Sequence, residues 1–456
     1  MPITLEDIPA ADETAVAPLR LWLWLLLLLL CLLAGALYGS LFWPAGKPVM
    51  TLAWWSRVLI WPLCGYAALL GVRLWWHDHC HNAVLDWNAD RETLLAEETL
   101  RGQQPLYLYA IAQQCSLGSD GLAARLLAGD SALAATAIDG VGHVICARFP
   151  ADFLAQALPE AAPEALPDDA DGETFASDED VAAMEIALAL EEDAADSPVV
   201  SSAEAAPPHS PASWLPRVFV QLLQALLPQL QALRSPPRVL LSWPPTLAAC
   251  DPLAHWQQAC ARCGVSLPPP DTTEQGLLLL DRCLEQATPL TLLVSVHGHE
   301  TPPAGSGDAA VALLFGPELP PAAVDMPPLA WLNRPEQLGR AGNSVTQSLA
   351  YALRWSTLPA SDVEQVWLAV PPGADQVAVL TALAELPLPT AAHPRIDVAA
   401  ALGDVGQTAG WLSLAAAAEH AANSSKPQWV IVSDPLPVAL VIEPLASPAS
   451  AEPPSE

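Results

Sequence analysis

The sequence predicts a layered α/β domain attached to a membrane through a hairpin of two N-terminal helices. Three observations support this prediction: a long uncharged stretch near the N-terminus, nearly all-apolar strand-like runs separated by helical patterns, and an acidic composition. The chain has 456 residues, a formal net charge of -32 and a mean hydropathy of +0.31. Past the hairpin roughly 370 residues remain, enough for one large domain or two of ordinary size. Because phosphates need Lys and Arg partners, the acidic balance argues against nucleic-acid binding.

The first predicted membrane span is Leu21–Trp43, a stretch without a charged residue. It is long enough to cross a hydrocarbon core of roughly 30 Å. The second predicted span lies between about Met50 and Trp76 and contains Arg57, whose side chain can reach the near interface if the span starts there. Tryptophans stand near the ends of this span, where interfacial aromatic belts are expected.

The orientation of the hairpin rests on few charges. Arg20 precedes the first span and Arg73 follows the second, against Lys47 in the loop. This distribution favours both ends on the cytoplasmic side of the membrane. The nine cysteines are scattered and odd in number, as in a reduced protein that faces the cytosol and carries no disulfide framework.

Composition divides the chain into six parts. They are an N-terminal tail (1–19), the transmembrane hairpin (20–76), a stalk with the first part of the soluble domain (77–154), an acidic Ala/Pro-rich insertion (155–213), the main α/β domain (214–445) and a tail (446–456). The insertion contains neither Lys nor Arg, and we expect it to be disordered because it cannot bury enough apolar surface. Its run Val181–Leu190 is expected to be a transient helix, with docking on the protein or a partner as the alternative.

Hydrophobic periodicity predicts the elements of the soluble part. Strands are expected at 105–111, 142–148, 238–242, 290–296, 309–315, 363–370, 396–398, 429–433 and 438–442, and helices at 82–100, 122–127, 219–233, 253–263, 273–286, 345–355, 376–386 and 408–422. Several of these strands are apolar throughout, which is typical of strands buried on both faces. The turn at 434–437 is expected to join the last two strands as a hairpin.

Four local features, spread over about 270–443, resemble the thiolase and β-ketoacyl synthase fold. They are the helix and apolar strand of Gly276–Val296, the glycine-rich turn and strand of Gly305–Leu314, the helix, loop and strand of Leu349–Val370, and the turn Leu402–Gly410 before an Ala-rich helix. The resemblance implies a thiolase-like domain whose first half comes from about 100–150 and 214–270.

The residues that such synthases use for catalysis do not stand at the matching positions. A decarboxylating synthase needs a Cys nucleophile and two His residues. The resemblance places the Cys near Asp271–Thr273, the first His within Pro371–Asp375 and the second His at Asp404. None of these positions holds the required residue, so we predict a pseudoenzyme with no cofactor.

A membrane-anchored, catalytically empty thiolase-like protein is similar to accessory proteins of bacterial type VI secretion clusters, above all the lipase-adaptor family. This resemblance implies a non-catalytic adaptor or scaffold that loads effectors. Its partner would be a secretion effector or a component of the secretion spike, and a homodimer is an alternative assembly. The resemblance also implies that the hairpin lies in the bacterial inner membrane and that the soluble domain faces the cytoplasm.

The alternative prediction is an acyl-transfer or hydrolytic enzyme that uses altered residues. Its candidates are His297, His299 and Glu300, which follow an apolar strand, and Asp404. Two His and one Glu have ligand chemistry, but we expect a polar loop and no metal site.

Two further patterns contain the residue types of metal or redox sites. The run His77–His81 contains three histidines, one aspartate and one cysteine, but adjacent helical residues do not converge on one ion. Cys260 and Cys263 have the redox spacing, yet a second such pair is missing, and we expect ordinary thiols. Glycine-rich phosphate-binding loops and the nucleophile elbow of hydrolases are also missing from the sequence.

Overall fold

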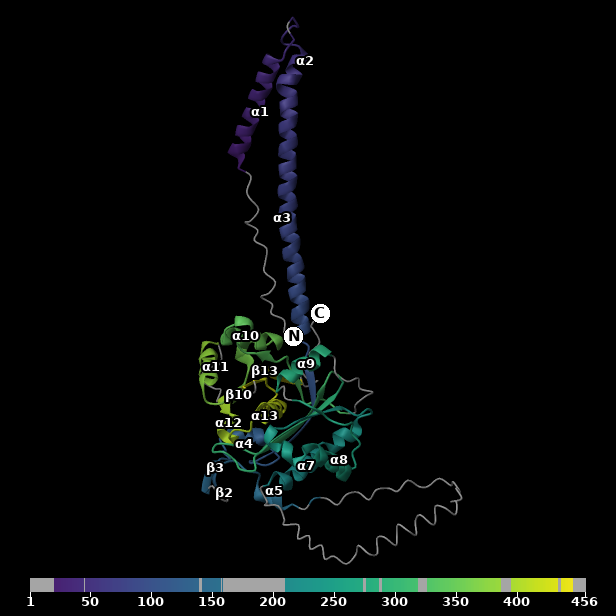
Figure 1. The fold of residues 1–456 in the computed structure, drawn as a ribbon, viewed down its shortest axis with the longest axis vertical. Helices are drawn as coiled ribbons and strands as arrows, with labels where there is room; N and C mark the ends of the chain where they lie inside the picture. The colour runs from purple at the N-terminus through teal and green to yellow at the C-terminus, as the bar shows by residue number, and fades with distance from the viewer. Residues whose placement is uncertain are drawn as a thin grey trace, which may run out of the picture. The chain divides into compact units, whose positions relative to one another are not determined.

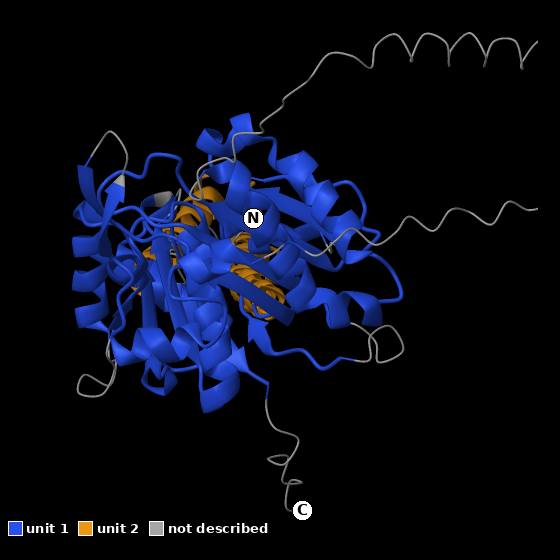
Figure 2. Cartoon of the chain, turned by 90° about the horizontal axis from the view of Figure 1, so that it is seen from below, with its two compact units in different colours: residues 1–2, 103–456 blue, residues 3–102 orange. Residues whose placement is uncertain are grey.

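The structure, a computed structural model, describes residues 20–44, 46–138, 142–156, 158, 210–273, 276–286, 289–318, 326–386, 395–433 and 436–445. The chain divides into two compact units, residues 3–102 and residues 1–2 with 103–456 (Figure 2). Most of the predicted acidic insertion, including Val181–Leu190, lies outside the described residues, as do both predicted tails and two residues of the 434–437 turn.

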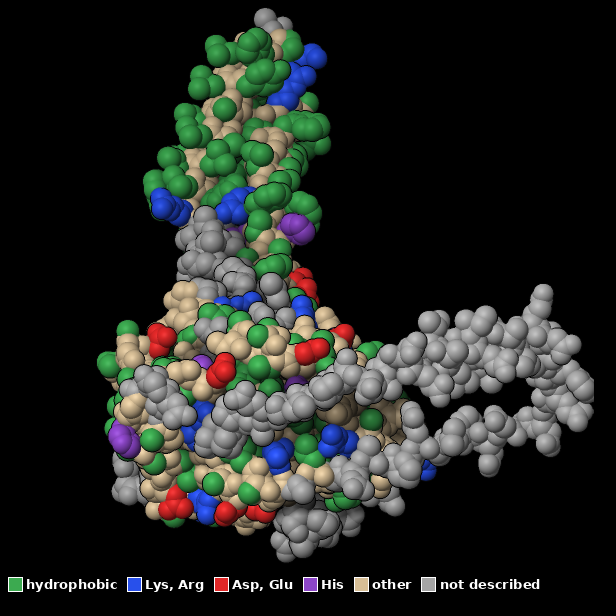
Figure 3. Space-filling model, turned by 60° about the horizontal axis from the view of Figure 1, so that its bottom comes forward, with side chains coloured by type: hydrophobic (Ala, Val, Ile, Leu, Met, Phe, Trp, Pro, Cys, Tyr) green, Lys and Arg blue, Asp and Glu red, His purple; other side chains and the backbone are tan. Residues whose placement is uncertain are grey.

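The smaller unit is a helical hairpin. Its elements are α1 (Leu21–Leu41), α2 (Leu52–Trp55), the π-helical η3 (Ser56–Ile60) and α3 (Trp61–Gly102) (Figure 1). Two helical stretches, Leu21–Leu41 and Leu52–Gly102, are long and apolar enough to cross a membrane. Gly35 and Gly39 are the buried residues of α1, where a Cβ would overlap Pro62 and Val58. Apolar side chains cover the visible face of the hairpin (Figure 3).

The hairpin prediction is confirmed as far as length and apolar composition go. One detail differs, because the predicted second span and the predicted stalk form a single helical run. The run His77–His81 lies inside this helix, where consecutive side chains point in different directions.

The described residues of the larger unit form a sheet of eleven strands. They are β1 (Leu106–Cys115), β4 (Arg238–Ser242), β5 (Asp271–Thr272), β6 (Thr291–His297), β7 (Ala309–Gly316), β8 (Ala330–Leu332), β9 (Glu336–Gln337), β10 (Gln365–Ala369), β11 (Arg395–Asp397), β12 (Gln428–Ser433) and β13 (Pro437–Pro444). A separate hairpin is formed by β2 (Ala134–Ile138) and β3 (Gly142–Cys146).

The sheet consists of two halves with the same topology. The order is β5-β4-β6-β7-β1 in the first half and β11-β10-β12-β13-β8 in the second. In each half the first three strands are parallel, and the fourth and fifth are each antiparallel to the strand before. Antiparallel pairing of β1 with β8 joins the halves, while β9 pairs only with β13. The chain therefore repeats one α/β pattern.

Helices cover and separate the two halves. They are α4 (Leu122–Ala128), α5 (Ala151–Ala155), α7 (Pro211–Ala232), α8 (Pro252–Cys263), α9 (Leu278–Gln286), α10 (Val345–Trp355), α11 (Ala374–Glu385), α12 (Val398–Leu402) and α13 (Thr408–Ser424). Three short 3₁₀ turns, η4 (Pro245–Cys250), η5 (Arg340–Gly342) and η6 (Ala360–Asp362), lie in loops.

Three apolar cores separate five layers, in which three layers of helices alternate with the two half-sheets. Alternate residues of one strand enter different cores: in β7, Val311 and Leu313 join the central core, whereas Ala312 and Leu314 join the core beneath α7 and α8. The second half alternates in the same way, with a third core beneath α10 and α11. Helices α9 and α13 belong to the central core, between the two half-sheets. The predicted layered α/β architecture is confirmed.

Helix α13 is the central element of this arrangement. Its middle is a run of buried alanines, which allows strands of both halves to approach it. Trp411 stacks on Phe315 of β7, with ring centroids 6.4 Å apart, so α13 of the second half packs against a strand of the first.

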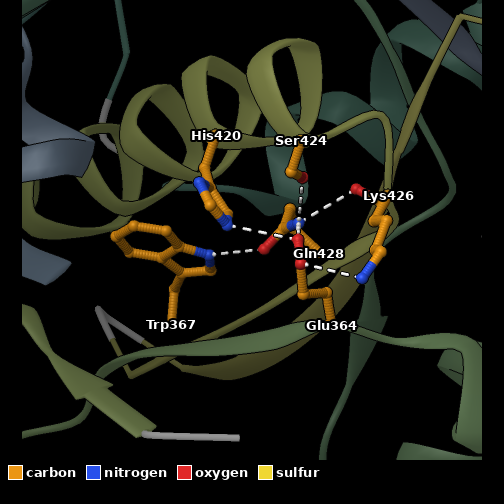
Figure 4. A network of polar contacts seen from close by, with 6 residues as sticks. All are labelled: Glu364, Trp367, His420, Ser424, Lys426 and Gln428. Atoms are coloured by element: carbon orange, nitrogen blue, oxygen red, sulfur yellow. Dashed lines mark hydrogen bonds and ion pairs between the residues drawn. The ribbon is translucent and has the colours of Figure 1, made fainter.

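A polar network fixes the carboxyl end of α13 (Figure 4). Gln428 accepts a hydrogen bond from Trp367 Nε1 at 3.2 Å and donates to Glu364 at 3.3 Å. Glu364 also pairs with His420 and Lys426, each at 3.2 Å. Because the network lies at the amino ends of β10 and β12, and active sites of α/β folds lie at the carboxyl ends, we assign it a structural role.

Several predicted elements need correction. The helix expected at 273–286 begins at Leu278, and its predicted first residue, Thr273, follows β5 and donates its N–H to the carbonyl of Leu241 in β4 at 2.9 Å. The first strand extends to Cys115 because β7 pairs along its length. The short elements β2, β8, β9 and α12 were not predicted, since tertiary pairing and not periodicity defines segments of this length.

Candidate functional site

Two glycine-rich loops, one from each half, cross at one end of the larger unit. Gly307 N–H donates to the carbonyl of Asp404 at 2.9 Å, and Asp404 N–H donates to the carbonyl of Gly305 at 2.7 Å. A Cβ at Gly403, whose φ is +79°, would lie 2.6 Å from the Gly305 oxygen. A Cβ at Gly307 would overlap the carbonyl oxygen of Leu402. The glycines are therefore required for the backbone contact that places Asp404.

The segment after β3 joins this crossing. Ala147 N–H donates to the carbonyl of Ser306 at 2.9 Å, and Asp308 N–H donates to the carbonyl of Ala147 at 2.8 Å. The loop before β7 is thus bonded on one side to the segment after β3 and on the other to the loop before α13.

Two histidines lie beside the crossing, at and just beyond the end of β6. Their Nε2 atoms are 3.2 Å apart, and the rings of His297 and His299 are nearly perpendicular, at 83°. His297 is buried and its ring packs on Gly406, where a Cβ would lie 2.6 Å from His297 Cε1. Gly406 has a φ of +51°, so both its conformation and its lack of a side chain fit this position.

Burial keeps both imidazoles neutral near pH 7. It lowers the pKa of His297 to about 4, with a smaller lowering from His299, while Asp404 acts in the opposite direction. Burial also lowers the pKa of His299; Asp404 again opposes the shift and Arg148 adds to it. In a neutral pair one Nε2–H donates to the other Nε2, which leaves each ring with its Nδ1 atom for other contacts.

A buried ion pair holds the peptide of His299. Arg148 Nε lies 3.3 Å from Asp308 Oδ2, and both side chains are almost fully buried. Arg148 Nη1 donates to the carbonyl oxygen of His299 at 2.7 Å, while the backbone N–H of His299 bonds to the Asp308 carboxylate. Burial raises the pKa of Asp308 to about 6, and Arg148 counteracts part of that rise. This pair fixes the backbone that carries the second imidazole.

A cavity of about 580 Å³ is lined by Asp404 and not by either histidine. Its walls include Gly305, Pro371, Asp404, Gly406 and Ser433. Pro371 follows β10 and Ser433 ends β12, so the cavity lies at the carboxyl ends of parallel strands, where α/β proteins commonly bind ligands. Asp404 Oδ1 accepts a hydrogen bond from Gly406 N–H at 2.9 Å, which orients the carboxylate.

Three of the four candidate residues from the sequence come together. His297, His299 and Asp404 form one electrostatic group, although they come from different halves. Glu300 is exposed, and its charge acts on Cys250 and is not among the influences on the two histidines.

The positions that the resemblance assigned to synthase catalysis are also located. The segment Asp271–Thr273 forms β5 and the residue after it, and Pro371 lines the cavity in place of a histidine. Cys283, in α9, is buried. Hence no cysteine thiol among the described residues occupies the assigned nucleophile position.

In the described part of the chain, no group of three or more His, Cys, Asp or Glu is arranged to hold a metal ion. Burial raises the pKa of Cys260 to about 12, with a further contribution from Cys263, whose own pKa burial also raises. Both thiols are free and protonated at neutral pH, which disfavours redox or ligand chemistry there.

Arg148 and Asp308 were not identified from the sequence. Each ends or begins an otherwise apolar strand run, GHVICAR and GDAAVALL, and a charge at the border of a buried strand is the signal that was available. Their pairing, across about 160 residues, is visible only in the fold.

No protein-family model and no curated protein matches the sequence. Solved ketosynthase structures are similar to it in fold. The ishigamide ketosynthase/chain length factor is 16% identical, with 75% of this chain and 100% of that chain covered and a TM-score of 0.48. A ketosynthase of the bacillaene synthase from Bacillus subtilis is 12% identical (76% and 71% covered, TM-score 0.47). An oxazolomycin ketosynthase domain from Streptomyces albus is 11% identical (76% and 76% covered, TM-score 0.48).

These findings correct one prediction. From the sequence we predicted that the chain is not an enzyme. This prediction is contradicted, because the solved structures with a similar fold are ketosynthases. The prediction rested on the synthase positions alone, whereas His297, His299 and Asp404 come together elsewhere in the fold.

Proposed function

We propose that the protein is a membrane-anchored hydrolase of acyl esters or thioesters, with His299 as general base. The arrangement of two neutral imidazoles in contact, next to a carboxylate that also lines a cavity, supports this proposal. A neutral imidazole accepts a proton from water, and a nearby carboxylate favours the cation that results. Asp404 fills the second role, since its charge favours the protonated form of both rings.

The reaction begins with attack of water on the acyl carbonyl carbon. The water proton passes to an imidazole nitrogen of His299, and a tetrahedral intermediate forms. Its collapse breaks the bond to the alkoxide or thiolate, which takes the proton back from the imidazolium. His297 stays neutral and orients His299 through the contact between the two Nε2 atoms, while Arg148 and Asp308 fix the His299 backbone.

Water is the nucleophile we favour because the nearby side-chain hydroxyls already have partners. The hydroxyls of Ser295 and Thr408 are bonded to each other at 2.9 Å and buried. Ser306 Oγ donates to the carbonyl of Pro303 at 2.7 Å, and Ser242 Oγ to Gln407 at 3.1 Å. These bonds favour hydrolysis over transfer through an acyl-enzyme.

The test is a panel of p-nitrophenyl esters and acyl-coenzyme A thioesters with the full-length protein in non-ionic detergent. We expect turnover with the wild type and a loss of about 100-fold or more in His299→Ala, the range typical of a general base. His420→Ala is the matched control, since its imidazole lies in the network of Figure 4 and should leave turnover unchanged. Absence of turnover across the panel, or full activity in His299→Ala, would contradict the proposal.

The pH profile gives a second readout. Because burial lowers the pKa of His299, the base stays unprotonated below the ordinary imidazole pKa. Activity should therefore hold as the pH falls to about 6.5, where a free imidazole is half protonated. A profile that falls by half at that pH would place the base elsewhere.

We further propose that the hairpin spans the bacterial inner membrane with both ends in the cytoplasm. The two apolar helices and the flanking Arg20 and Arg73 support this placement. A cysteine introduced at Lys47 should react with a membrane-impermeant maleimide in cells with a permeabilised outer membrane. Labelling only after lysis would reverse the orientation.

The predicted link to type VI secretion rests on the sequence resemblance alone and stays a prediction. It is tested by affinity capture of the detergent-solubilised protein from its host, with mass spectrometry of the bound proteins. Capture of a spike protein or an effector would support a secretion role, and capture of the protein alone would count against it.

A further inference from the structure

A groove of about 630 Å³ lies on the helical hairpin, between α1 and the helical run of η3 and α3. Its walls are almost wholly apolar, and they include Cys31, Gly35 and Tyr38 on one side and Trp61, Gly65 and Leu69 on the other. The groove follows the second run for roughly 18 Å, since it extends from residue 57 to residue 69 at about 1.5 Å per residue. Its shape and chemistry therefore suit an extended hydrocarbon chain.

One end of the groove carries a positive charge. Arg57 lies at the loop end and, among the described residues that line the groove, is the charged one. Its guanidinium carbon lies 5.7 Å from the centroid of the Trp43 ring, a cation–π contact that orients the guanidinium without neutralising it. Residues 20–77 contain no Asp or Glu, so the hairpin itself offers this arginine no carboxylate. An anion that pairs with Arg57 must come from outside the hairpin.

The local backbone and the position of Arg57 also indicate a binding site. Arg57 belongs to η3, a π-helical turn, and such turns are rare and occur frequently at functional sites. Trp43 stands just past the end of α1, at the depth where aromatic side chains meet the lipid headgroups. The guanidinium beside it is therefore placed at headgroup level, while the apolar walls continue toward the hydrocarbon core.

A second copy of the chain fits this groove less well than a lipid does. The surface of α1 that allows close helix contact is already used inside the hairpin, where Gly35 meets Pro62 and Gly39 meets Val58. A copy seated in the groove by two-fold symmetry would bring a second Arg57 and again no carboxylate. Such a contact would place two like charges beside an apolar interface.

We propose that the groove binds one anionic phospholipid, with its phosphate at Arg57 and an acyl chain along the apolar walls. Guanidinium and phosphate form strong, charge-assisted hydrogen bonds, and the pairing offsets the cost of an arginine at the membrane border. The inference rests on insertion of the hairpin in a membrane, in either orientation. It is independent of the hydrolase proposal, because no residue near His299 takes part.

The test is a lipid titration of the full-length protein in non-ionic detergent, with bound lipid counted by native mass spectrometry. Dioleoyl phosphatidylglycerol and dioleoyl phosphatidylcholine are the probes, since they share their acyl chains and differ in net headgroup charge. We expect the first phosphatidylglycerol to bind about tenfold more tightly than the first phosphatidylcholine, as for a hydrogen bond to a charged group. Arg57→Gln should remove this preference, whereas Arg20→Gln, at the opposite end of α1, should keep it.

A matched pair of glycine variants tests the acyl-chain part of the site. At Gly65 and at Gly71, both in α3, no atom lies within 4 Å of an added Cβ, so leucine is accommodated at either position. Only Gly65 lines the groove. Gly65→Leu should weaken phosphatidylglycerol binding about tenfold, the effect of excluding about two methylene groups from apolar contact. Gly71→Leu should leave it unchanged.

Several results would overturn the proposal. They are equal affinity of the wild type for the two lipids, wild-type preference in Arg57→Gln, wild-type affinity in Gly65→Leu, and a lipid-free dimer as the main species. The last result would assign the groove to a second copy of the chain.

Discussion

The substitution Gly307→Ala tests the loop crossing that positions Asp404. The new Cβ would overlap the carbonyl oxygen of Leu402 and lie 2.8 Å from Val405 Cγ1. Leu402 ends α12 and Val405 lies in the loop that follows, and the first contact is with backbone, so the two chain segments must separate. Separation breaks the bonds from Gly307 N–H to Asp404 and from Asp404 N–H to Gly305.

The expected cost follows from these contacts. Each lost backbone hydrogen bond contributes about 1 kcal/mol. The overlap in a packed site adds about 1 to 3 kcal/mol. The free energy of unfolding should therefore fall by about 3 to 5 kcal/mol, and hydrolytic activity should fall with it because Asp404 moves.

Urea unfolding of the full-length protein in non-ionic detergent, followed by tryptophan fluorescence, measures the change. Gly305→Ala is the matched control in the same loop. Its φ is +80°, but no atom lies within 4 Å of the added Cβ, so it carries only the conformational cost of about 1 to 2 kcal/mol. If Gly307→Ala were no more destabilising than Gly305→Ala, the described crossing would be refuted.

Three further predictions concern buried ionisable side chains and use the same unfolding assay. The pKa of His297 is about 4 in the fold against 6.5 ordinarily, so the unfolded chain takes up the proton first and the contribution of His297, about 3 kcal/mol, is lost as pH falls from 6.5 to 4. Because Asp308 contributes with the opposite sign over the same pH range, the loss is measured as the difference in unfolding free energy between the wild type and His297→Gln. The pKa of Asp308 is raised from 3.8 to about 6, so its contribution is present below pH 4 and about 3 kcal/mol is lost as pH rises to 6; an unchanged slope in Asp308→Asn would contradict this. Arg334, 2% exposed, pairs with Asp281 at 3.4 Å and Glu285 at 2.8 Å, so Arg334→Met should cost about 3 to 5 kcal/mol, against little for the exposed Arg395→Met.

The sequence was most informative where a segment is buried on both faces. The run Leu290–Val296 is almost wholly apolar and forms β6, and the run Ala309–Phe315 forms β7 beside it. The very short strands β5 and β8 were missed, because they exist only through pairing with strands elsewhere in the chain.

The candidate site was predicted in part. His297 and His299 were chosen because they follow a buried strand, and Asp404 because it stands at a position that the synthase resemblance marks. Their proximity depends on the glycine crossing, which joins residues about 100 apart. Arg148 was missed for the same reason, since a lone arginine after a strand gives no sign of the carboxylate that it meets.

The most direct test of the central claim is single-turnover hydrolysis of an acyl thioester in ¹⁸O-labelled water by the full-length protein, with mass spectrometry of both the released acid and the intact chain. Water activation by His299 predicts one ¹⁸O atom in the acid, no acyl adduct on the protein at any time, and loss of both turnover and labelled acid in His299→Ala. An acyl adduct that forms and decays with turnover would show a nucleophile in the chain and contradict the account, as would unchanged turnover in His299→Ala.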